Sequence, residues 1–326
     1  MLIAEEVYDL VLDDVFVRLD QLVPESSLYL KLEGLNPAGS VKLKTAVALV
    51  RDAEEQAEKS RRPFLRTRLI ESTSGNLGVA LAMVCAAKGY ALTCVTDPNA
   101  NRQSVQLMRA LGAEVVVIDA PDANGGFLQS RINYIRRRLR REPHTHWLNQ
   151  YANAAGPAAH RDRTGRAIVE HIGHPDYVFV GAGTTGTLMG CGAYLRAHSP
   201  QTRIVAVDTV GSVTFGTPAG PRHIPGLGTS RRPEILDPAL VDDLVLIPES
   251  EAVAMCRALA RERGLLLGGS TGTVLAAVRK AAKDIPAGST VVAVSPDFGD
   301  RYLDTLYDDQ WVAERWPGTN GKAEKH

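Results

Sequence analysis

Apolar, strand-like segments alternate with amphipathic, helix-like segments along most of this chain, and this alternation limits the possible folds more than any other feature. After a helix that begins at Lys42, strand and helix signals follow one another at regular spacing up to about residue 145, and a second series follows later in the chain. Such alternation is typical of parallel sheets covered by helices on both faces. We therefore predict an α/β fold with two lobes, each containing a mainly parallel sheet.

The pattern also predicts the individual elements. Strands are expected at residues 27–33, 64–71, 91–96, 114–119, 177–180, 203–207, 244–247 and 290–294, and helices at residues 42–58, 78–88, 105–111, 128–139, 251–262 and 273–283. We assign residues 39–145 to a smaller, mobile lobe and residues 1–38 together with 146–309 to a larger lobe. Residues 310–326 are polar, and we expect a disordered tail there.

The composition argues against several classes of function. Of the 326 residues, 44% are hydrophobic and 23% are charged, and 37 Lys and Arg residues balance 37 Asp and Glu residues. A balanced charge gives no overall field for nucleic acid or a membrane surface, and no apolar run is long enough to span a membrane. The four scattered cysteines lack metal-ligand spacing, and the N-terminus lacks the pattern of a signal peptide. We expect a cytoplasmic protein with reduced cysteines and no metal site.

The arginine-rich segment at residues 136–141 could suggest nucleic-acid binding. However, Leu128, Ile132, Ile135 and Leu139 form an apolar stripe at helical spacing. The arginines therefore fall on the outer side of one amphipathic helix, and we interpret them as a solvated face.

Lys42 lies at a predicted corner between a strand and a helix. The preceding turn, residues 36–42, has the sequence NPAGSVK. A side chain at such a corner is held more rigidly than one in a mobile loop, so Lys42 is our candidate for an amine that carries a cofactor. In the alternative interpretation, Ser40 caps the helix and Lys42 is an ordinary solvated residue.

A glycine- and threonine-rich loop, GAGTTGT at residues 181–187, joins a predicted strand to a helix. Its glycines allow close approach of the backbone, and its N–H groups, its hydroxyls and the helix dipole all favour an anion, most plausibly phosphate. The alternative is a flexible turn. A P-loop is disfavoured because no Gly-Lys-Ser/Thr ends the loop, and a dinucleotide-binding motif lacks its acidic residue.

Two further loops are rich in small polar residues. The loop STSGNLG, residues 72–78, places hydroxyls and amides at a helix N-terminus, an arrangement that suits a carboxylate, with a simple capped helix as the alternative. The segment GGSTGT, residues 268–273, is predicted to be a similar turn with a weaker signal.

Six ordered motifs resemble those of the cysteine synthase and cystathionine β-synthase family, whose members are fold-type II enzymes dependent on pyridoxal 5′-phosphate (PLP). The motifs are NPxGSxK (residues 36–42), TSGNxG (73–78), NQYxN (149–153), GTTGT (183–187), GLG (226–228) and PDFGDRY (296–302). The resemblance covers about residues 10–309. It implies PLP as the cofactor, amino acids as substrates and a homodimer as the usual assembly.

The resemblance also implies roles for individual residues. Lys42 would bind the cofactor covalently and act as general base when released, and Asn76 would contact the ring oxygen. The cofactor phosphate would be held by Gly183, Thr184, Thr185, Gly186 and Thr187. The substrate α-carboxylate would be bound by Ser72, Thr73, Ser74, Asn76 and Gln150.

Two further assignments are open between alternatives. Asp297 is our candidate partner for the pyridine nitrogen of the cofactor, with the nearby Ser295 as the alternative. Tyr151 is our candidate for an active-site hydroxyl, with a packed aromatic ring as the alternative.

Several positions depart from the sulfhydrylases of this family. Lys42 is followed by Leu43 and Lys44 in place of Asp-Arg, Leu77 replaces a threonine, and residues 15–16 (VF) replace an early Thr-Pro. These changes resemble the branch that joins O-phospho-L-serine to the amine of L-glutamate, giving N-(2-amino-2-carboxyethyl)-L-glutamate for the biosynthesis of 2,3-diaminopropionate in siderophores and peptide antibiotics.

The segment GGFLQSR, residues 125–131, adds to this likeness, because it ends in an arginine suited to a second carboxylate. Arg131 lies beside the apolar stripe and could reach the cleft, or it could be one more surface arginine. Three alternatives to the glutamate reaction stay open. They are a cysteine synthase that uses sulfide, a serine/threonine dehydratase, and a PLP-fold binding module without catalysis.

Overall fold

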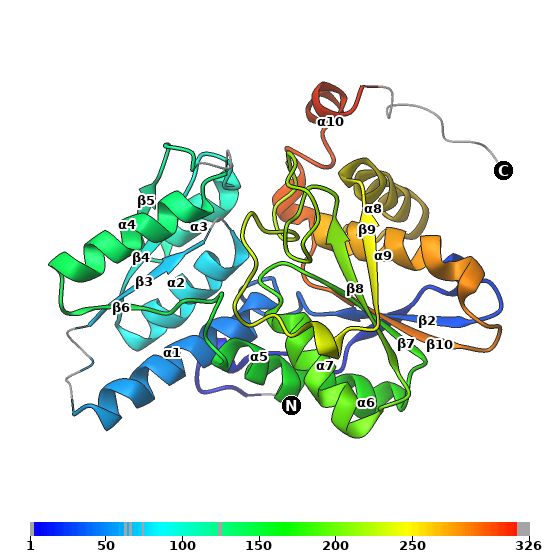
Figure 1. Ribbon diagram of the computed structural model, residues 1–326, viewed down its shortest axis with the longest axis horizontal. Helices are drawn as coiled ribbons and strands as arrows, with labels where there is room; N and C mark the ends of the chain where they lie inside the picture. Colours follow the sequence, from blue (N-terminus) through cyan, green and yellow to red (C-terminus); the bar gives the residue numbers. More distant parts are fainter. Residues whose placement is uncertain (1–2, 62–63, 65–66, 74, 123–125, 318–326) are drawn as a thin grey trace.

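The computed structural model describes residues 3–317 apart from 62–63, 65–66, 74 and 123–125. It shows two lobes, each organised around its own sheet (Figure 1). The larger sheet has the strand order β1-β2-β10-β7-β8-β9, and the smaller one has the order β5-β4-β3-β6. All neighbouring strands are parallel except β1 and β2. The predicted α/β fold with two mainly parallel sheets is confirmed.

The elements have the following bounds. The strands are β1 (Phe16–Arg18), β2 (Ser27–Leu32), β3 (Arg68–Ser72), β4 (Ala91–Thr96), β5 (Glu114–Val117), β6 (Thr145–Trp147), β7 (Tyr177–Gly181), β8 (Arg203–Thr209), β9 (Asp243–Ile247) and β10 (Thr290–Ser295). The α-helices are α1 (Lys42–Lys59), α2 (Asn76–Lys88), α3 (Arg102–Ala110), α4 (Leu128–Arg141), α5 (Ala155–His160), α6 (Arg166–Ile172), α7 (Gly186–His198), α8 (Glu249–Arg263), α9 (Gly269–Ala281) and α10 (Asp309–Arg315).

The larger sheet is buried on both faces. Successive side chains of a strand point to opposite faces, and β7 divides its residues in this way. Phe179 packs in a buried cluster with Val274 of α9, whereas Val178 and Val180 pack in a second cluster with Leu188 of α7. Helices on both faces therefore leave the carboxyl ends of the strands as the free edge for chemistry.

The smaller lobe has a core in which α1 and α2 pack together. Leu43 and Leu49 of α1 share a buried cluster with Leu81 of α2. A Cβ at Gly78 would lie 2.3 Å from the Met108 Sδ and 2.8 Å from the Thr73 Cγ2, so glycine at that position leaves room for both side chains. The polar loop before α2 is thus attached to a helix that is packed in the core of the smaller lobe.

The prediction of a turn at residues 268–273 is wrong, because Gly269–Ala281 is the helix α9. Small residues at its start serve helix packing. A Cβ at Gly272 would lie 2.4 Å from the backbone oxygen of Ala252 in α8, so the glycine permits close contact between the two helices. The local pattern of small residues could not reveal this long-range contact.

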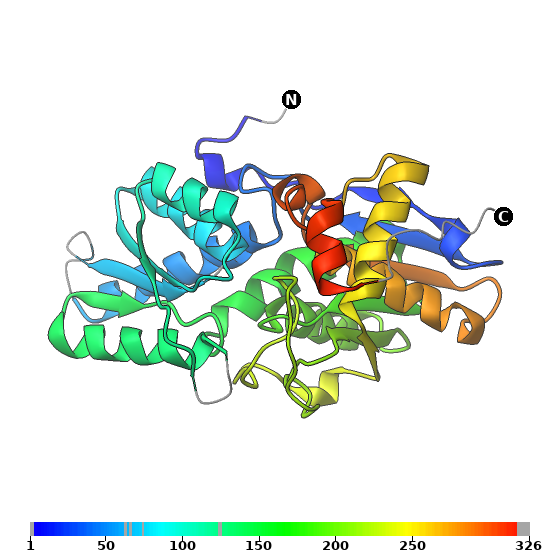
Figure 2. The same ribbon diagram turned by 90° about the horizontal axis from the view of Figure 1, so that it is seen from above.

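The prediction of disorder beyond residue 309 is also wrong for its first part, which forms α10 (Figure 2). Asp308 caps this helix, because its side chain accepts a hydrogen bond from the Trp311 N–H. Val312 is 1% exposed and packs in a cluster with Val253 and Leu306. Residues 318–326 of the predicted tail lie outside the described residues.

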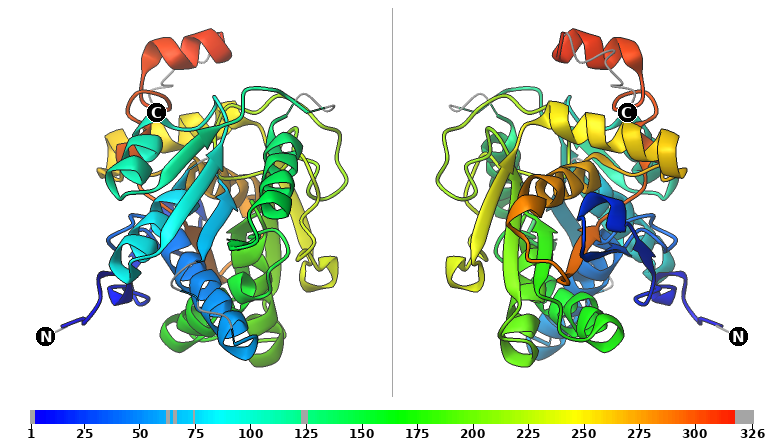
Figure 3. Two further views of the ribbon diagram at one scale, coloured as in Figure 1. Left: turned by 90° about the vertical axis from the view of Figure 1, so that its left-hand side faces the viewer. Right: turned by 90° about the vertical axis from the view of Figure 1, so that its right-hand side faces the viewer.

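The two ends of the chain leave the body of the molecule in different places. In both views of Figure 3, the N-terminal segment (dark blue) extends outward at the bottom, and α10 (red) lies at the top. Within the described ranges, none of the helices combines the length and the apolar character needed to cross a membrane.

Candidate active site

Lys42 is the first residue of α1, and the loop before it is held in one conformation. The Asn36 side-chain amide donates a hydrogen bond to the carbonyl oxygen of Ser40 at 2.9 Å. The Val41 N–H donates to the carbonyl oxygen of Pro296 at 2.7 Å, which ties the loop to the end of β10. Lys42 is therefore positioned by two separate segments of the chain.

Ser40 does not cap α1, so the alternative account of Lys42 as a residue after a serine cap is wrong. The N-cap residue is Val41, and no side chain caps the helix. Ser40 is fully buried, and its Oγ has no hydrogen-bond partner among the described residues.

The amine of Lys42 is available for chemistry. No hydrogen bond or ion pair joins its Nζ to a residue that the structure describes. Burial lowers the pKa of Lys42, while the negative charge of Asp297 opposes this change. A lowered pKa favours the neutral amine, which can act as a nucleophile or as a base.

A polar network beside Lys42 joins the two lobes. Asn76, at the start of α2, donates to the Asp297 Oδ2 at 2.7 Å and accepts from the Arg301 Nη1 at 2.6 Å. Tyr302 also donates to the Asp297 Oδ2. Burial raises the pKa of Asp297, and these hydrogen bonds and the nearby positive charges act in the opposite direction. The other oxygen, Asp297 Oδ1, is buried without a hydrogen-bond partner in the described structure.

Sequence reasoning missed Arg301 and Tyr302 as members of this network, although both belong to the PDFGDRY motif. It also missed Thr271, whose Oγ1 lies 2.9 Å from the Ser295 Oγ. Ser295 is the last residue of β10 and Asp297 lies two positions further on, so both stay candidates for the pyridine nitrogen.

The glycine- and threonine-rich loop joins β7 to α7, as predicted, and α7 begins at Gly186. A Cβ at Gly183 would lie 2.4 Å from the backbone oxygen of Gly226, so this position requires glycine. Thr185 has a φ of 69°, a left-handed conformation that is uncommon outside glycine, and its buried Oγ1 has no partner in the described residues. The loop presents polar groups at the N-terminus of a long helix, where an anion is stabilised.

Thr184 and Thr187 belong to the same loop. Thr187 contacts His160, because its Oγ1 lies 3.4 Å from the His160 Nε2. Sequence reasoning did not single out His160.

The loop after β3 contains the predicted carboxylate site. Thr73 precedes the N-cap residue Gly75, and its Oγ1 accepts a hydrogen bond from the Gly78 N–H in the first turn of α2 at 3.0 Å. Gln150 donates to the carbonyl oxygen of Ser72 at 2.8 Å, and the Ser72 Oγ is buried without a partner among the described residues. The fold thus brings Gln150 to this loop from a distant part of the sequence. Ser74 lies outside the described residues.

Glu71 lies directly beneath this loop. It accepts hydrogen bonds from the N–H groups of Ser72 at 2.9 Å and Gln150 at 3.3 Å. Burial raises the pKa of Glu71 to about 7 despite these donors. Glu71 therefore links the two segments that form the predicted carboxylate site.

Arg131 is buried, with 7% of its surface exposed, and so it is not a surface arginine. Its Nε lies 3.4 Å from the Asp97 Oδ2, and its Nε and Nη1 have no hydrogen-bond partner within the described residues. Tyr151 packs against Leu128 and Ile132 of α4. Burial raises the pKa of Tyr151, and the charge of Arg131 works against that rise. Arg131 and Tyr151 therefore lie in one environment.

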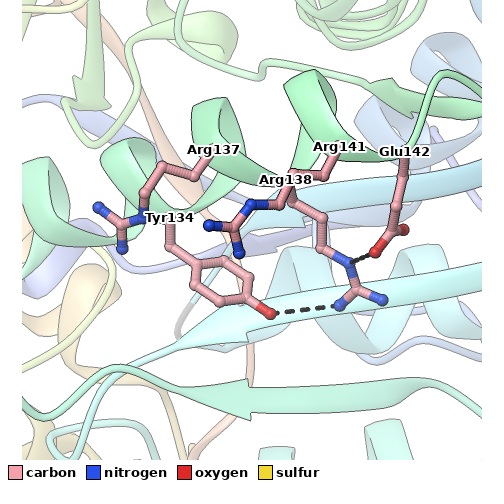
Figure 4. A pocket seen from close by; sticks show the side chains of 5 residues that line it. All are labelled: Tyr134, Arg137, Arg138, Arg141 and Glu142. Carbon is pink, nitrogen blue, oxygen red and sulfur yellow. Dashed lines mark hydrogen bonds and ion pairs between the residues drawn. The ribbon is translucent and has the colours of Figure 1, made fainter.

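The other arginines of α4 form a hollow on its outer side, lined by Tyr134, Arg137, Arg138, Arg141 and Glu142 (Figure 4). Arg137 and Arg141 are exposed, and the Arg138 Nε lies 2.8 Å from the Glu142 Oε1. The interpretation of residues 136–141 as the outer side of an amphipathic helix is confirmed.

The fold and the site define the class of the protein as a two-lobed α/β enzyme. The family model described as pyridoxal-phosphate dependent enzyme matches residues 14–297, and the chain belongs to that family. Its cofactor is PLP, as predicted.

Solved structures place the chain further within that family. A lysine-to-alanine mutant of O-ureido-L-serine synthase with O-ureido-L-serine bound is 32% identical, with a TM-score of 0.85, and the match covers 96% of this chain and 98% of that one. An O-acetylserine-dependent cystathionine β-synthase from Helicobacter pylori is 31% identical (TM-score 0.83; 94% and 99% covered). A hydrogen sulfide-producing enzyme from Fusobacterium nucleatum is also 31% identical (TM-score 0.84; 92% and 100% covered). The protein is a PLP-dependent enzyme of the cysteine synthase family and of the β-replacement type, as predicted.

The site fits such a cofactor. Ser72, Thr185 and Asp297 each have a buried oxygen without a hydrogen-bond partner among the described residues, and buried polar atoms of this kind normally have partners. Asp297 also acts electrostatically on the amine of Lys42. Lys42, Asn76, residues 183–187 and Asp297 would hold PLP, which supplies an electron sink for carbanion chemistry at the substrate α-carbon.

Proposed function

We propose that this enzyme replaces the β-substituent of O-phospho-L-serine with the amine of L-glutamate, forming N-(2-amino-2-carboxyethyl)-L-glutamate for 2,3-diaminopropionate biosynthesis. The observation that carries the proposal is the buried guanidinium of Arg131, two of whose nitrogens have no hydrogen-bond partner among the described residues. Sulfide needs no such group. Glutamate brings two carboxylates, and a buried guanidinium without full hydrogen bonding suits one of them.

Other residues of the chain perform the remaining tasks. The neutral amine of Lys42 removes the substrate α-proton. The N–H groups and hydroxyls around Thr73, with the side chain of Gln150, bind the α-carboxylate. Tyr151, which lies near Arg131, supplies a hydroxyl to the active site.

Among the solved relatives, O-ureido-L-serine synthase bears a name that describes a product with an oxygen substituent on the β-carbon. Relatives with this fold therefore make products other than sulfur-containing amino acids, which is compatible with an amine nucleophile here. The relative supports the proposal without identifying the nucleophile.

The test combines amino-acid donors with nucleophiles. Purified holoenzyme is incubated with O-phospho-L-serine or O-acetyl-L-serine, each with L-glutamate or sulfide, and the products are identified by mass. The expected product is the glutamate adduct from O-phospho-L-serine, absent with Lys42→Ala. Cysteine formed from sulfide without any glutamate adduct contradicts the proposal.

Cysteine synthesis from sulfide is the second candidate. It is favoured by the pairing of Arg131 with Asp97, which neutralises part of the charge that a carboxylate would need. The same assay also detects pyruvate, and pyruvate as the main product would indicate a serine/threonine dehydratase.

We also propose a homodimer. The N-terminal segment exposes large apolar side chains, Ile3 (76% exposed), Val7 (40%) and Leu12 (42%), which a second copy of the chain could cover. Light scattering after size-exclusion chromatography gives the mass directly. A monomer at micromolar concentration contradicts the dimer.

A further inference from the structure

A chain of buried polar side chains runs beneath the glycine- and threonine-rich loop and ends at Thr187. Lys44 donates to the Thr164 Oγ1 at 3.0 Å, and this oxygen lies 3.1 Å from the His160 Nδ1. The opposite nitrogen, His160 Nε2, lies 3.0 Å from the Thr45 Oγ1 and 3.4 Å from the Thr187 Oγ1. Thr164 and His160 are fully buried, and Lys44 is 3% exposed.

The direction of the first hydrogen bond is fixed by charge. Lys44 forms ion pairs with Glu33 and Asp13. Although burial acts to raise the pKa of Glu33, the charges of Lys44 and Lys31 hold it below its usual value. An ammonium has only donors, so the Thr164 oxygen accepts from Lys44.

The Thr164 hydroxyl must then place its own hydrogen elsewhere. Among the described residues, the only hydrogen-bond acceptor near this fully buried oxygen is the His160 Nδ1. Since buried hydroxyls are rarely left unpaired, Thr164 donates to Nδ1. The imidazole hydrogen of a neutral His160 therefore resides on Nε2 and points toward Thr45 and Thr187.

His160 has reason to stay neutral. Burial lowers its pKa well below the usual value, and the positive charge of Lys44 lowers it further. The ring is thus a fixed donor at Nε2 and a fixed acceptor at Nδ1.

We propose that His160 is a positioning residue for the cofactor phosphate, acting through Thr187. The single Nε2–H is shared between the Thr45 Oγ1 at 3.0 Å and the Thr187 Oγ1 at 3.4 Å. Because Nε2 offers no lone pair, Thr187 cannot donate to the ring, and its hydroxyl hydrogen is free to point toward the loop. A bound phosphate presents only hydrogen-bond acceptors, so it needs the Thr187 hydroxyl as a donor. With the opposite tautomer, Thr187 would donate to the ring and its hydrogen would be lost to the phosphate. The proposal rests on the assignment of residues 183–187 to the cofactor phosphate.

The test measures binding to the apoenzyme. The affinity for PLP, for pyridoxal without phosphate and for inorganic phosphate is determined for wild type, Thr164→Val, Thr164→Ser and Thr187→Val. We expect Thr164→Val to weaken PLP and inorganic phosphate about tenfold, the scale of one hydrogen bond to a charged group. Pyridoxal binding should stay unchanged, and Thr164→Ser should keep the wild-type affinities. His198→Gln, a change of an exposed histidine, is the matched control.

A second measurement reads the tautomer of His160 in the wild-type protein. In ¹⁵N-histidine-labelled wild type, the signals of His160 are identified by their loss in His160→Gln, and the two ring nitrogens report the tautomer. A proton on Nε2 is expected, and a proton on Nδ1 overturns the proposal.

The binding results distinguish two claims: that the hydrogen-bond chain from Lys44 through Thr164 and His160 orients Thr187, and that residues 183–187 hold the phosphate. If Thr187→Val weakens PLP binding and Thr164→Val does not, the proposed role of Thr164 and His160 is wrong, and the assignment of residues 183–187 to the phosphate holds. If neither variant changes PLP binding, Thr187 does not contact the phosphate, and the proposal is overturned.

Discussion

At the scale of single residues, the lowered pKa of Lys42 is the clearest link between structure and chemistry. Lys42→Ala removes both the amine that binds the cofactor and the base that takes the α-proton, so we expect kcat to fall at least about a thousandfold. Steady-state kinetics measure the change. Lys59→Ala, an exposed lysine of the same helix, is the control. Near-normal turnover by Lys42→Ala would disprove the assignment.

Asp297 influences the site through charge. If its buried carboxylate pairs with the pyridine nitrogen, Asp297→Asn should shift the visible absorption of the bound cofactor and lower kcat about ten- to a hundredfold. The exposed neighbour Asp300→Asn is the matched control. An unchanged spectrum with unchanged kcat would assign the pyridine contact to another group, with Ser295 the first candidate.

At the scale of elements, Glu71 connects β3 to the segment that carries Gln150, and its raised pKa gives a prediction for stability. An unfolded glutamate has a pKa near 4.5 and the folded one has a pKa of about 7, so the folded state holds the extra proton between these values. This contribution is fully present below about pH 4.5 and is lost as the pH rises through about 7, with a size of about 3 kcal/mol.

Denaturant unfolding of wild type and Glu71→Gln at pH 5 and pH 8 measures this contribution. The amide also disturbs the hydrogen bonds from Ser72 and Gln150, so the comparison uses the difference between the two pH values. We expect that difference to change by about 3 kcal/mol in Glu71→Gln and to stay unchanged in the exposed Glu262→Gln. The same pH dependence in wild type and Glu71→Gln would refute the raised pKa.

The sequence predicted the elements whose signals are local. Alternating apolar runs located the strands, with β4 at the expected residues 91–96, and runs of small polar residues after strands located the loops before α2 and α7, but not the third predicted turn, which belongs to α9. Contacts between distant residues were not predictable in this way. Arg301 reaches Asn76 across 225 positions, His160 reaches Thr45 across 115, and α10 is held by Val312 in a cluster formed by other parts of the chain. A pattern within one segment carries no information on such partners.

At the scale of the whole molecule, each lobe contributes different residues to the proposed active site. The loop at residues 72–78 and Arg131 belong to the lobe of the smaller sheet, whereas residues 183–187 and Asp297 follow strands of the larger sheet. The contact of Asn76 with Asp297 and Arg301 joins the two sides beside Lys42. A substrate in the cleft would therefore touch both lobes, and a residue that binds only the nucleophile should affect only the second half of the reaction.

Arg131→Ala tests this division. We expect the KM for glutamate to rise about ten- to a hundredfold, because a hydrogen bond to a charged group is lost. Phosphate release from O-phospho-L-serine alone, measured in a single turnover, should stay near the wild-type rate, because that half-reaction does not use the second carboxylate. Arg137→Ala changes an exposed arginine of the same helix and is the matched control. Equal losses in both half-reactions would indicate instead that the ion pair of Arg131 with Asp97 supports the fold of the small lobe. Arg131 would then not be the residue that binds glutamate.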